Sequence, residues 1–263
     1  MATDIIYAYC LLNTQPDLHQ NMNLRNLKSI AIDDYIVVVK FVFSDEFSEE
    51  NFKRNLLDID WLEYNNHEHV EVITLLMNQI TVIPFKFGTL FNNENSLKKF
   101  ITDHSDSLIE NFLHIDGKEE WSVKIYCNRK ALSEQIDELS EEMATLEKQI
   151  MASSPGKAFL LKRKKSELVE YEMDRICKSY GQNYYDEFRK LSASTNLNNL
   201  LPKEFTGRED TMILNAVFLV NKANVNDFRN TVNTFRKAGI SDFFIETTGP
   251  GPPFSFVYIK ANQ

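Results

Sequence analysis

Residues 247–256 read TTGPGPPFSF and hold the densest group of turn-forming residues in the chain. Three of the seven prolines and two of the eight glycines fall within residues 249–253. Proline fixes φ and glycine tolerates positive φ, so the block predicts a stiff corner between two strands, residues 243–247 and 254–259. The block is a poor phosphate loop, because its prolines lack the N–H groups that a phosphate cradle needs.

The same corner offers candidate contacts for a protein partner, because a rigid proline segment next to aromatic rings is a common recognition surface. The candidate residues are Pro252, Pro253, Phe254 and Phe256. A purely structural corner is the simpler interpretation, and both stay open. If the two rings are contacts, replacing Phe254 and Phe256 with serine weakens partner binding and leaves the fold intact, whereas unfolding shows that they are core.

Composition excludes several classes of protein. The chain has 263 residues and is 43% hydrophobic, which suits two domains with cores of their own. Its formal net charge of -9 argues against nucleic acid and an anionic lipid membrane as partners, because such binders present a basic face. Three separated cysteines without a CxxC pair fit reduced thiols. With no signal-peptide pattern and no long apolar stretch, a soluble cytoplasmic protein is predicted.

The first half mixes strand and helix patterns, and we predict an α+β domain over residues 1–117. β-Branched and alternating runs predict strands at residues 5–12, in two pieces of 27–43 that turn at Asp33-Asp34, and at 80–83. Apolar residues at helical spacing predict helices over 48–57, with Ser48 as N-cap, over 61–79 and over 94–113.

The second half, residues 118–263, begins with a predicted strand at 120–128 and continues with a helical hairpin over about 129–191. An a/d seam with steps of 4, 3, 4, 3 and 4 defines the first arm: Leu132, Ile136, Leu139, Met143, Leu146 and Ile150. Pro155-Gly156 ends that arm, and the second arm is predicted over 159–191. Beyond a polar loop at 192–199, strands are expected at 212–220, 243–247 and 254–259, with a helix at 225–238.

Sequence motifs give no support for catalysis. His67-Glu68-His69 is the only local histidine cluster, and residues two apart on a helix point in nearly opposite directions, so the pair cannot share one metal ion. No nucleotide-binding loop, calcium loop or nucleophile elbow occurs. We therefore predict no catalytic residue, no metal and no cofactor.

Four segments, in order along the chain, carry a family resemblance: VIPFKFGTLF at 82–91, EWSVKI at 120–125, PGKAFL at 155–160 and the proline block at 247–256. Together they resemble the gas vesicle protein F/L family, whose Gly-x-Ala-Tyr-Leu motif the third segment matches with Phe159 in place of tyrosine. The resemblance implies an α+β N-terminal domain followed by a modified ferredoxin-like domain with extra helices. None of the motifs carries a chemical role that can be transferred to single residues.

The resemblance also implies a function: a non-enzymatic accessory protein of gas vesicle assembly. In this interpretation the chain binds the hydrophobic shell protein and other accessory proteins, and it limits shell-protein aggregation during nucleation. The expected contacts are the proline corner and exposed positions of the hairpin. Two alternatives stay open. One is a scaffold whose hairpin pairs with helices of other accessory proteins, and the other is a cytosolic ligand-binding protein or enzyme on a ferredoxin-like fold.

Overall fold

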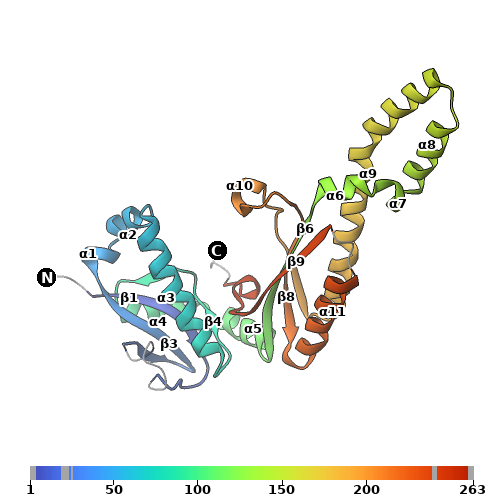
Figure 1. The fold of residues 1–263 in the computed structure, drawn as a ribbon. Coiled ribbons are helices and arrows are strands. Elements are labelled where there is room, and N and C mark those ends of the chain that lie inside the picture. The colour runs from blue at the N-terminus through green and yellow to red at the C-terminus, as the bar shows by residue number, and fades with distance from the viewer. Residues whose placement is uncertain (1–3, 19–23, 25, 239–241, 260–263) are drawn as a thin grey trace. The chain divides into compact units, whose positions relative to one another are not determined.

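The computed structural model describes residues 4–18, 24, 26–238 and 242–259 (Figure 1). It mixes helices and strands throughout, which confirms the α+β class. The chain divides into two compact units. Unit 1 contains the residues up to Glu120 together with those from Pro250 onward, and unit 2 contains Trp121–Gly249. This division differs from the predicted domains 1–117 and 118–263, chiefly because the segment after Gly249 belongs with unit 1.

Unit 1 is built on an antiparallel sheet with β1 at its centre. Its strands are β1 (Asp4–Leu12), β2 (Lys28–Ile32), β3 (Tyr35–Phe43), β4 (Ile83–Pro84) and β5 (Leu90–Phe91). The order is β2-β3-β1-β4, and β5 also pairs with β1. The predicted turn lies at Asp33, whose φ of 51° is in the left-handed region that aspartate tolerates. The expected strand at 80–83 is shorter and ends in Pro84.

A β-bulge in β1 decides which side chains enter the core of unit 1. The pairing with β3 shifts between Ala8 and Cys10, which leaves Tyr9 as the extra residue. Such a bulge changes the alternation of side chains by one position. Tyr7, Tyr9 and Cys10 consequently all join the core cluster that the sheet forms with helix α3 (Ile59–Met77).

The helices of unit 1 are α1 (Ser44–Phe47), α2 (Glu49–Asn55), α3 (Ile59–Met77), α4 (Glu94–Asp103) and α5 (Ser105–Ile115). The Ser48 side chain accepts a hydrogen bond from the Asn51 N–H, so the predicted N-cap is confirmed. One predicted helix, 94–113, is in fact two. His104 has φ −112° and ψ 12° and separates α4 from α5, within a run of residues of low helix propensity, Thr102–Ser105.

Unit 2 has a four-stranded sheet in the order β7-β8-β6-β9. Its strands are β6 (Lys118–Cys127), β7 (Ser194–Leu197), β8 (Thr211–Asn221) and β9 (Phe243–Gly251). β7 falls in the stretch predicted as a polar loop, because its sequence STNL lacks the alternation that marks a strand. The remaining helices are α10 (Lys203–Thr206) and α11 (Val225–Ala238), and η2 (Lys222–Asn224) precedes α11. Both α11 and the long helix α9 (Pro155–Lys190) pack against β8.

The helical hairpin of unit 2 is confirmed, but its first arm is broken into α6 (Arg129–Glu134), α7 (Ile136–Leu139) and α8 (Glu141–Met151). Ser140 interrupts it because its hydroxyl caps α8 at the Met143 N–H and donates to the buried Glu172 carboxylate at 2.8 Å. The second arm, α9 (Pro155–Lys190), lies beside α8 (Figure 1). It begins before the predicted residue 159, because proline suits the first turn of a helix.

The predicted seam is buried within the hairpin itself. Leu132, Ile136 and Met143 pack against Met173 and Ile176 of α9, and Leu146 and Ile150 are buried as well. The side chain of Leu139 lies outside the described part of the structure. Since α9 already covers the seam, the seam does not offer a free face to another protein.

The last described segment differs from the prediction. Residues 254–259 were expected to form a strand, but Phe254–Phe256 is a short 3-10 helix, η3. The strand before it, β9, extends to Gly251, so the corner is confined to Pro252 and Pro253. Proline at two successive positions removes the N–H groups that would continue a strand ladder, which explains why β9 ends here.

Gly181 gives a testable prediction about how α9 meets the sheet. A Cβ added at Gly181 would lie 2.9 Å from the Ile213 carbonyl oxygen of β8, a backbone atom that cannot rotate away. We expect Gly181→Ala to lower the free energy of unfolding of unit 2 by about 1–3 kcal/mol, although alanine normally stabilises a helix. Urea unfolding followed by Trp121 fluorescence, in a Trp61→Phe background, measures the change.

Gly156, in the first turn of the same helix, is the matched control because nothing lies within 4 Å of its added Cβ. Gly156→Ala should leave unit 2 unchanged or raise its stability by up to about 1 kcal/mol. Equal effects of the two substitutions would contradict the close contact between α9 and β8.

Candidate functional site

The four residues singled out by sequence lie mostly in the interior of unit 1. Pro252 and Pro253 are buried, and the Phe256 side chain is only 2% exposed. Phe254 is half-buried and packs against the core cluster of unit 1, with its ring centroid 6.2 Å from that of His69. A role of these residues in partner binding stays a prediction, and their burial gives them a structural role as well.

Hydrogen bonds hold the segment around η3 in place. The Glu120 carboxylate accepts from both the N–H and the hydroxyl of Ser255, each at 2.8 Å. Burial raises the pKa of Glu120, and the two bonds from Ser255 oppose that rise. On α5, the Asn111 side chain accepts from the Tyr258 N–H and donates to the Tyr258 carbonyl oxygen. The segment is therefore anchored through its backbone as well as through Phe256.

Large apolar side chains are exposed where the hairpin turns. Met151 ends α8, and Phe159 and Leu160 lie in the first turns of α9; they are 78%, 70% and 66% exposed. These three residues are called the hairpin tip below. Three large apolar groups so exposed within ten residues of sequence are costly in water and typically mark an interaction surface. The hairpin was expected to contribute contacts, and these positions are among those it leaves uncovered.

The histidine cluster divides as its spacing predicted: His67 is exposed and His69 is buried. His69 Nε2 donates to the Phe85 carbonyl oxygen at 3.0 Å, and its Nδ1 therefore accepts from the Tyr7 hydroxyl at 2.9 Å. The Tyr7 oxygen also accepts from the Gly88 N–H. Each polar atom of the His69 ring is thus satisfied within the protein.

The electrostatics of this network oppose ionisation. Burial lowers the pKa of His69, although the Phe85 carbonyl and the nearby Glu68 carboxylate favour its charged form. Burial likewise raises the pKa of the Tyr7 hydroxyl and of the Cys10 thiol. A phenol and a thiol held neutral in this way are poor nucleophiles at neutral pH, and the basic nitrogen of His69, Nδ1, is already occupied by the Tyr7 hydroxyl. The arrangement stabilises the core.

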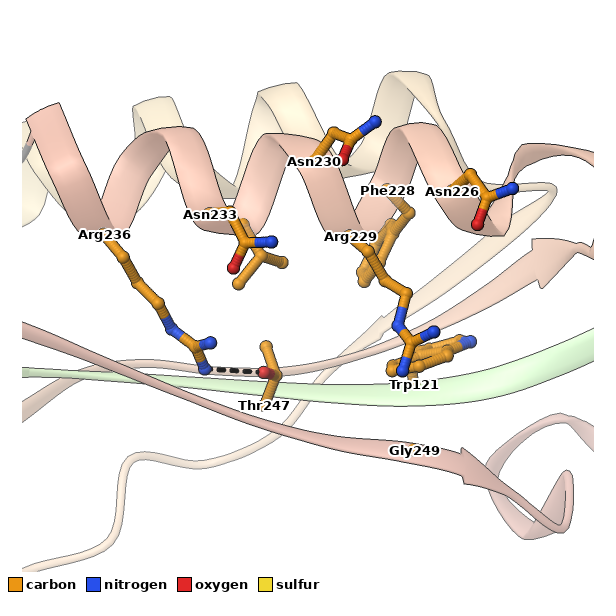
Figure 2. Close-up of a pocket in the computed structure, with 10 residues that line it drawn as sticks. Trp121, Asn226, Phe228, Arg229, Asn230, Asn233, Arg236, Thr247 and Gly249 are labelled. Atoms are coloured by element: carbon orange, nitrogen blue, oxygen red, sulfur yellow. Dashed lines mark hydrogen bonds between the residues drawn. The ribbon is translucent and has the colours of Figure 1, made fainter.

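A polar groove of about 490 Å³ lies in unit 2 between α11 and β9. Figure 2 shows Arg236 reaching from α11 to Thr247, and Arg229 lying over the Trp121 ring. The Arg236 Nη2 to Thr247 Oγ1 distance is 2.9 Å, and the Arg229 guanidinium carbon is 5.3 Å from the Trp121 ring centroid. Sequence reasoning missed this groove, although one signal was available. Asn226, Arg229, Asn233 and Arg236 recur at helical spacing and so share one face of α11.

Two further searches cover only the residues that the structure describes. Among them, no three side chains of histidine, cysteine, aspartate or glutamate come together in a way that could hold a metal ion. None of their helices is both long enough and apolar enough to cross a lipid bilayer.

Both the sequence and the fold of this chain are similar to those of known gas vesicle proteins. The family model described as "Gas vesicle synthesis protein GvpL/GvpF" matches residues 5–258. Gas vesicle protein L of Streptomyces sp. (strain CB03234) is 24% identical over 230 residues, which cover 86% of this chain and 81% of that protein. The crystal structure of GvpF from Anabaena sp. PCC7120 matches with a TM-score of 0.72 and 19% identity, over 98% of this chain and 100% of that one. GvpF from Microcystis aeruginosa matches with a TM-score of 0.67 and 17% identity, over 97% and 99%.

Proposed function

Since the chain belongs to the GvpL/GvpF family of gas vesicle synthesis proteins, we propose that it binds the small hydrophobic shell protein of the vesicle and limits its aggregation during nucleation. The resemblance seen in four sequence segments is confirmed by this membership. The family is one of gas vesicle accessory proteins, and we propose no enzymatic activity. The place of action is the growing vesicle in the cytoplasm, with the shell protein and other accessory proteins as partners.

The hairpin tip carries this proposal. A shell subunit that presents an apolar face to gas aggregates in water unless that face is covered, so an accessory protein needs exposed apolar side chains of its own. Met151, Phe159 and Leu160 supply them at the end of a hairpin. The net charge of -9 keeps the rest of the chain soluble while these side chains remain exposed.

Replacing Met151, Phe159 and Leu160 together with serine should abolish most of the binding. Covering each large apolar side chain contributes about 1.5–3 kcal/mol, so even partial burial of three predicts at least about tenfold weaker binding. Light scattering of freshly refolded shell protein, with size-exclusion co-elution, measures the effect. The wild-type chain should suppress scattering, and the triple variant should fail at the same concentration.

Tyr171→Ser is the matched control for this experiment. Tyr171 lies on the same helix, is 65% exposed, and is roughly 16 Å along α9 from Leu160. It should bind like wild type. If the triple variant still suppresses aggregation and melts at the wild-type temperature, the hairpin tip is not the contact. The proline corner, Phe254 above all, then becomes the surface to test.

We also infer a ferredoxin-like arrangement for unit 2. Along the chain, β6 is followed by helices, then β7 and β8, then α11 and β9, which is the β-α-β-β-α-β sequence of that fold. The sheet order β7-β8-β6-β9 supports the assignment, because the first and third strands of the motif are the central pair. The hairpin of α8 and the first half of α9 is then an extension of the first helical connection.

A further inference from the structure

We propose that the groove between α11 and β9 binds an extended acidic segment of a partner protein. This inference does not depend on the proposed contact between the hairpin tip and the shell protein. It rests on the charge of the groove, on an unsatisfied donor in its wall, and on the free edge of β9. The residues that line this groove include Trp121, Asn226, Arg229, Asn233, Arg236 and Thr247.

The charge of the groove is opposite to that of the chain. Two arginines line it and no carboxylate does, although the chain has 38 acidic and 29 basic residues. Elsewhere in unit 2, Arg129, Arg175 and Arg208 each pair with a carboxylate. Among the described residues, Arg229 and Arg236 form no such pair. An anionic ligand would therefore meet two guanidinium groups that are not already neutralised.

The wall of the groove contains a donor without an acceptor. Trp121 is 5% exposed, and its indole Nε1 has no hydrogen-bond partner among the described residues. In Figure 2 this nitrogen lies at the end of the ring nearest Asn226, and Arg229 covers the opposite end. A buried N–H without a partner costs about 1–3 kcal/mol. A ligand oxygen that draws Arg229 off the ring would give this donor an acceptor.

The shape of the groove favours a peptide over a small anion. It follows the polar face of α11 from Asn226 to Arg236, about 15 Å, which is the length of four or five residues of extended chain. β9 is an edge strand of the sheet order, with β6 as its only described neighbour. The Ile245 carbonyl of β9 accepts from the Arg236 side chain. An added strand can pair with such an edge while its acidic side chains reach the two arginines.

Small residues explain why the groove exists at this end of β9. Ile245, Thr247 and Gly249 alternate along the strand and so face the same side. Ile245 is buried in the core of unit 2, whereas Thr247 and Gly249 are too small to fill the space below α11. That space is left to the arginine and asparagine side chains.

Trp121 fluorescence tests the proposal in the full chain. A Trp61→Phe background leaves Trp121 as the single tryptophan, because the chain has two. The probe is a synthetic peptide that alternates glutamate and valine, compared with the same peptide carrying glutamine in place of glutamate. We expect saturable binding of the glutamate peptide, at least about tenfold weaker binding of the glutamine peptide, and weaker binding as salt rises from about 50 to about 300 mM.

Arg229→Gln combined with Arg236→Gln should weaken binding of the glutamate peptide by about tenfold or more. The control removes the same charge from exposed positions outside the groove, Lys178→Gln with Arg189→Gln, and should stay within about twofold of the parent. If the arginine variant melts at a lower temperature than the parent, Asn230→Asp combined with Asn233→Asp replaces it. These two carboxylates line the groove and should also weaken binding, because they repel the glutamate side chains of the peptide.

Four results would overturn the proposal. The first two are no binding of any peptide and equal binding of the glutamate and glutamine peptides. The third is an equal loss of peptide affinity in the arginine variant and in the control variant. The fourth is full displacement of the glutamate peptide by inorganic phosphate at the same concentration of negative charge. The last result would identify a small-anion site. A glutamate peptide methylated at alternate backbone nitrogens should lose binding, and unchanged binding would exclude strand addition to β9.

Discussion

Phe256→Ala should lower the free energy of unfolding of unit 1 by about 3–5 kcal/mol, the usual cost of removing a fully buried phenylalanine ring. Phe256 is 2% exposed and lies near the His114 ring of α5, with ring centroids 6.4 Å apart. The bonds between Glu120 and Ser255 hold it there, so the segment cannot easily collapse into the cavity. Urea unfolding followed by Trp61 fluorescence, in a Trp121→Phe background, reports on unit 1.

The control is Phe43→Ala on β3, a phenylalanine that is 66% exposed. Its loss should change stability by less than about 1 kcal/mol. The experiment also decides between the two interpretations of the proline corner. If Phe256→Ala leaves the urea midpoint unchanged and weakens shell-protein binding, the ring is a contact and the structural assignment is wrong.

His69→Leu should destabilise unit 1 by about 2–4 kcal/mol. Leucine fills the space but removes the acceptor of the Tyr7 O–H, whose oxygen keeps only the bond from the Gly88 N–H, and the donor to the Phe85 carbonyl. Each lost partner of a buried polar group costs about 1–3 kcal/mol. Thermal and urea unfolding, again with Trp61 as the probe, measure the loss. His67→Leu is the control because His67 lies exposed two residues away, and it should change stability by less than about 0.5 kcal/mol.

The same residue predicts a pH dependence. Burial lowers the pKa of His69 below its ordinary value of 6.5, so between these two pKa values the unfolded chain binds a proton that the folded chain does not. Stability is therefore fully present above pH 6.5 and falls as the pH drops below it, by at most about 1.4 kcal/mol per pH unit from this group. Urea midpoints between pH 7.5 and 5 should fall less steeply in His69→Leu than in His67→Leu. Parallel curves would contradict a neutral buried His69.

Local patterns predicted most elements because they depend on neighbours in sequence. The β-branched run before Phe43, the Ser48 cap and the amphipathic stretch 225–238 each set their own structure. The failures occur where distant contacts override local preference. STNL at 194–197 is a strand because β8 pairs with it, and Phe254–Phe256 leaves the extended conformation because Glu120 and α5 bind the residues beside it.

The candidate sites show the same limit. Sequence marked Phe254 and Phe256 as notable but could not assign their burial, which depends on the return of the chain to unit 1. It placed contacts on the hairpin without saying which residues the seam leaves uncovered. The groove was missed because Thr247 and Trp121 meet α11 only in the folded sheet.

Unit 1 is assembled from two stretches of the chain separated by the whole of unit 2. During synthesis, the ribosome must make residues 121–249 before Pro252, Phe254 and Phe256 can reach α5 and Glu120. At about 5–20 residues per second, this interval is on the order of ten seconds. Through it, nascent unit 1 lacks the ring that fills its core. The unit that begins first along the chain is thus also the one whose last segment is made last.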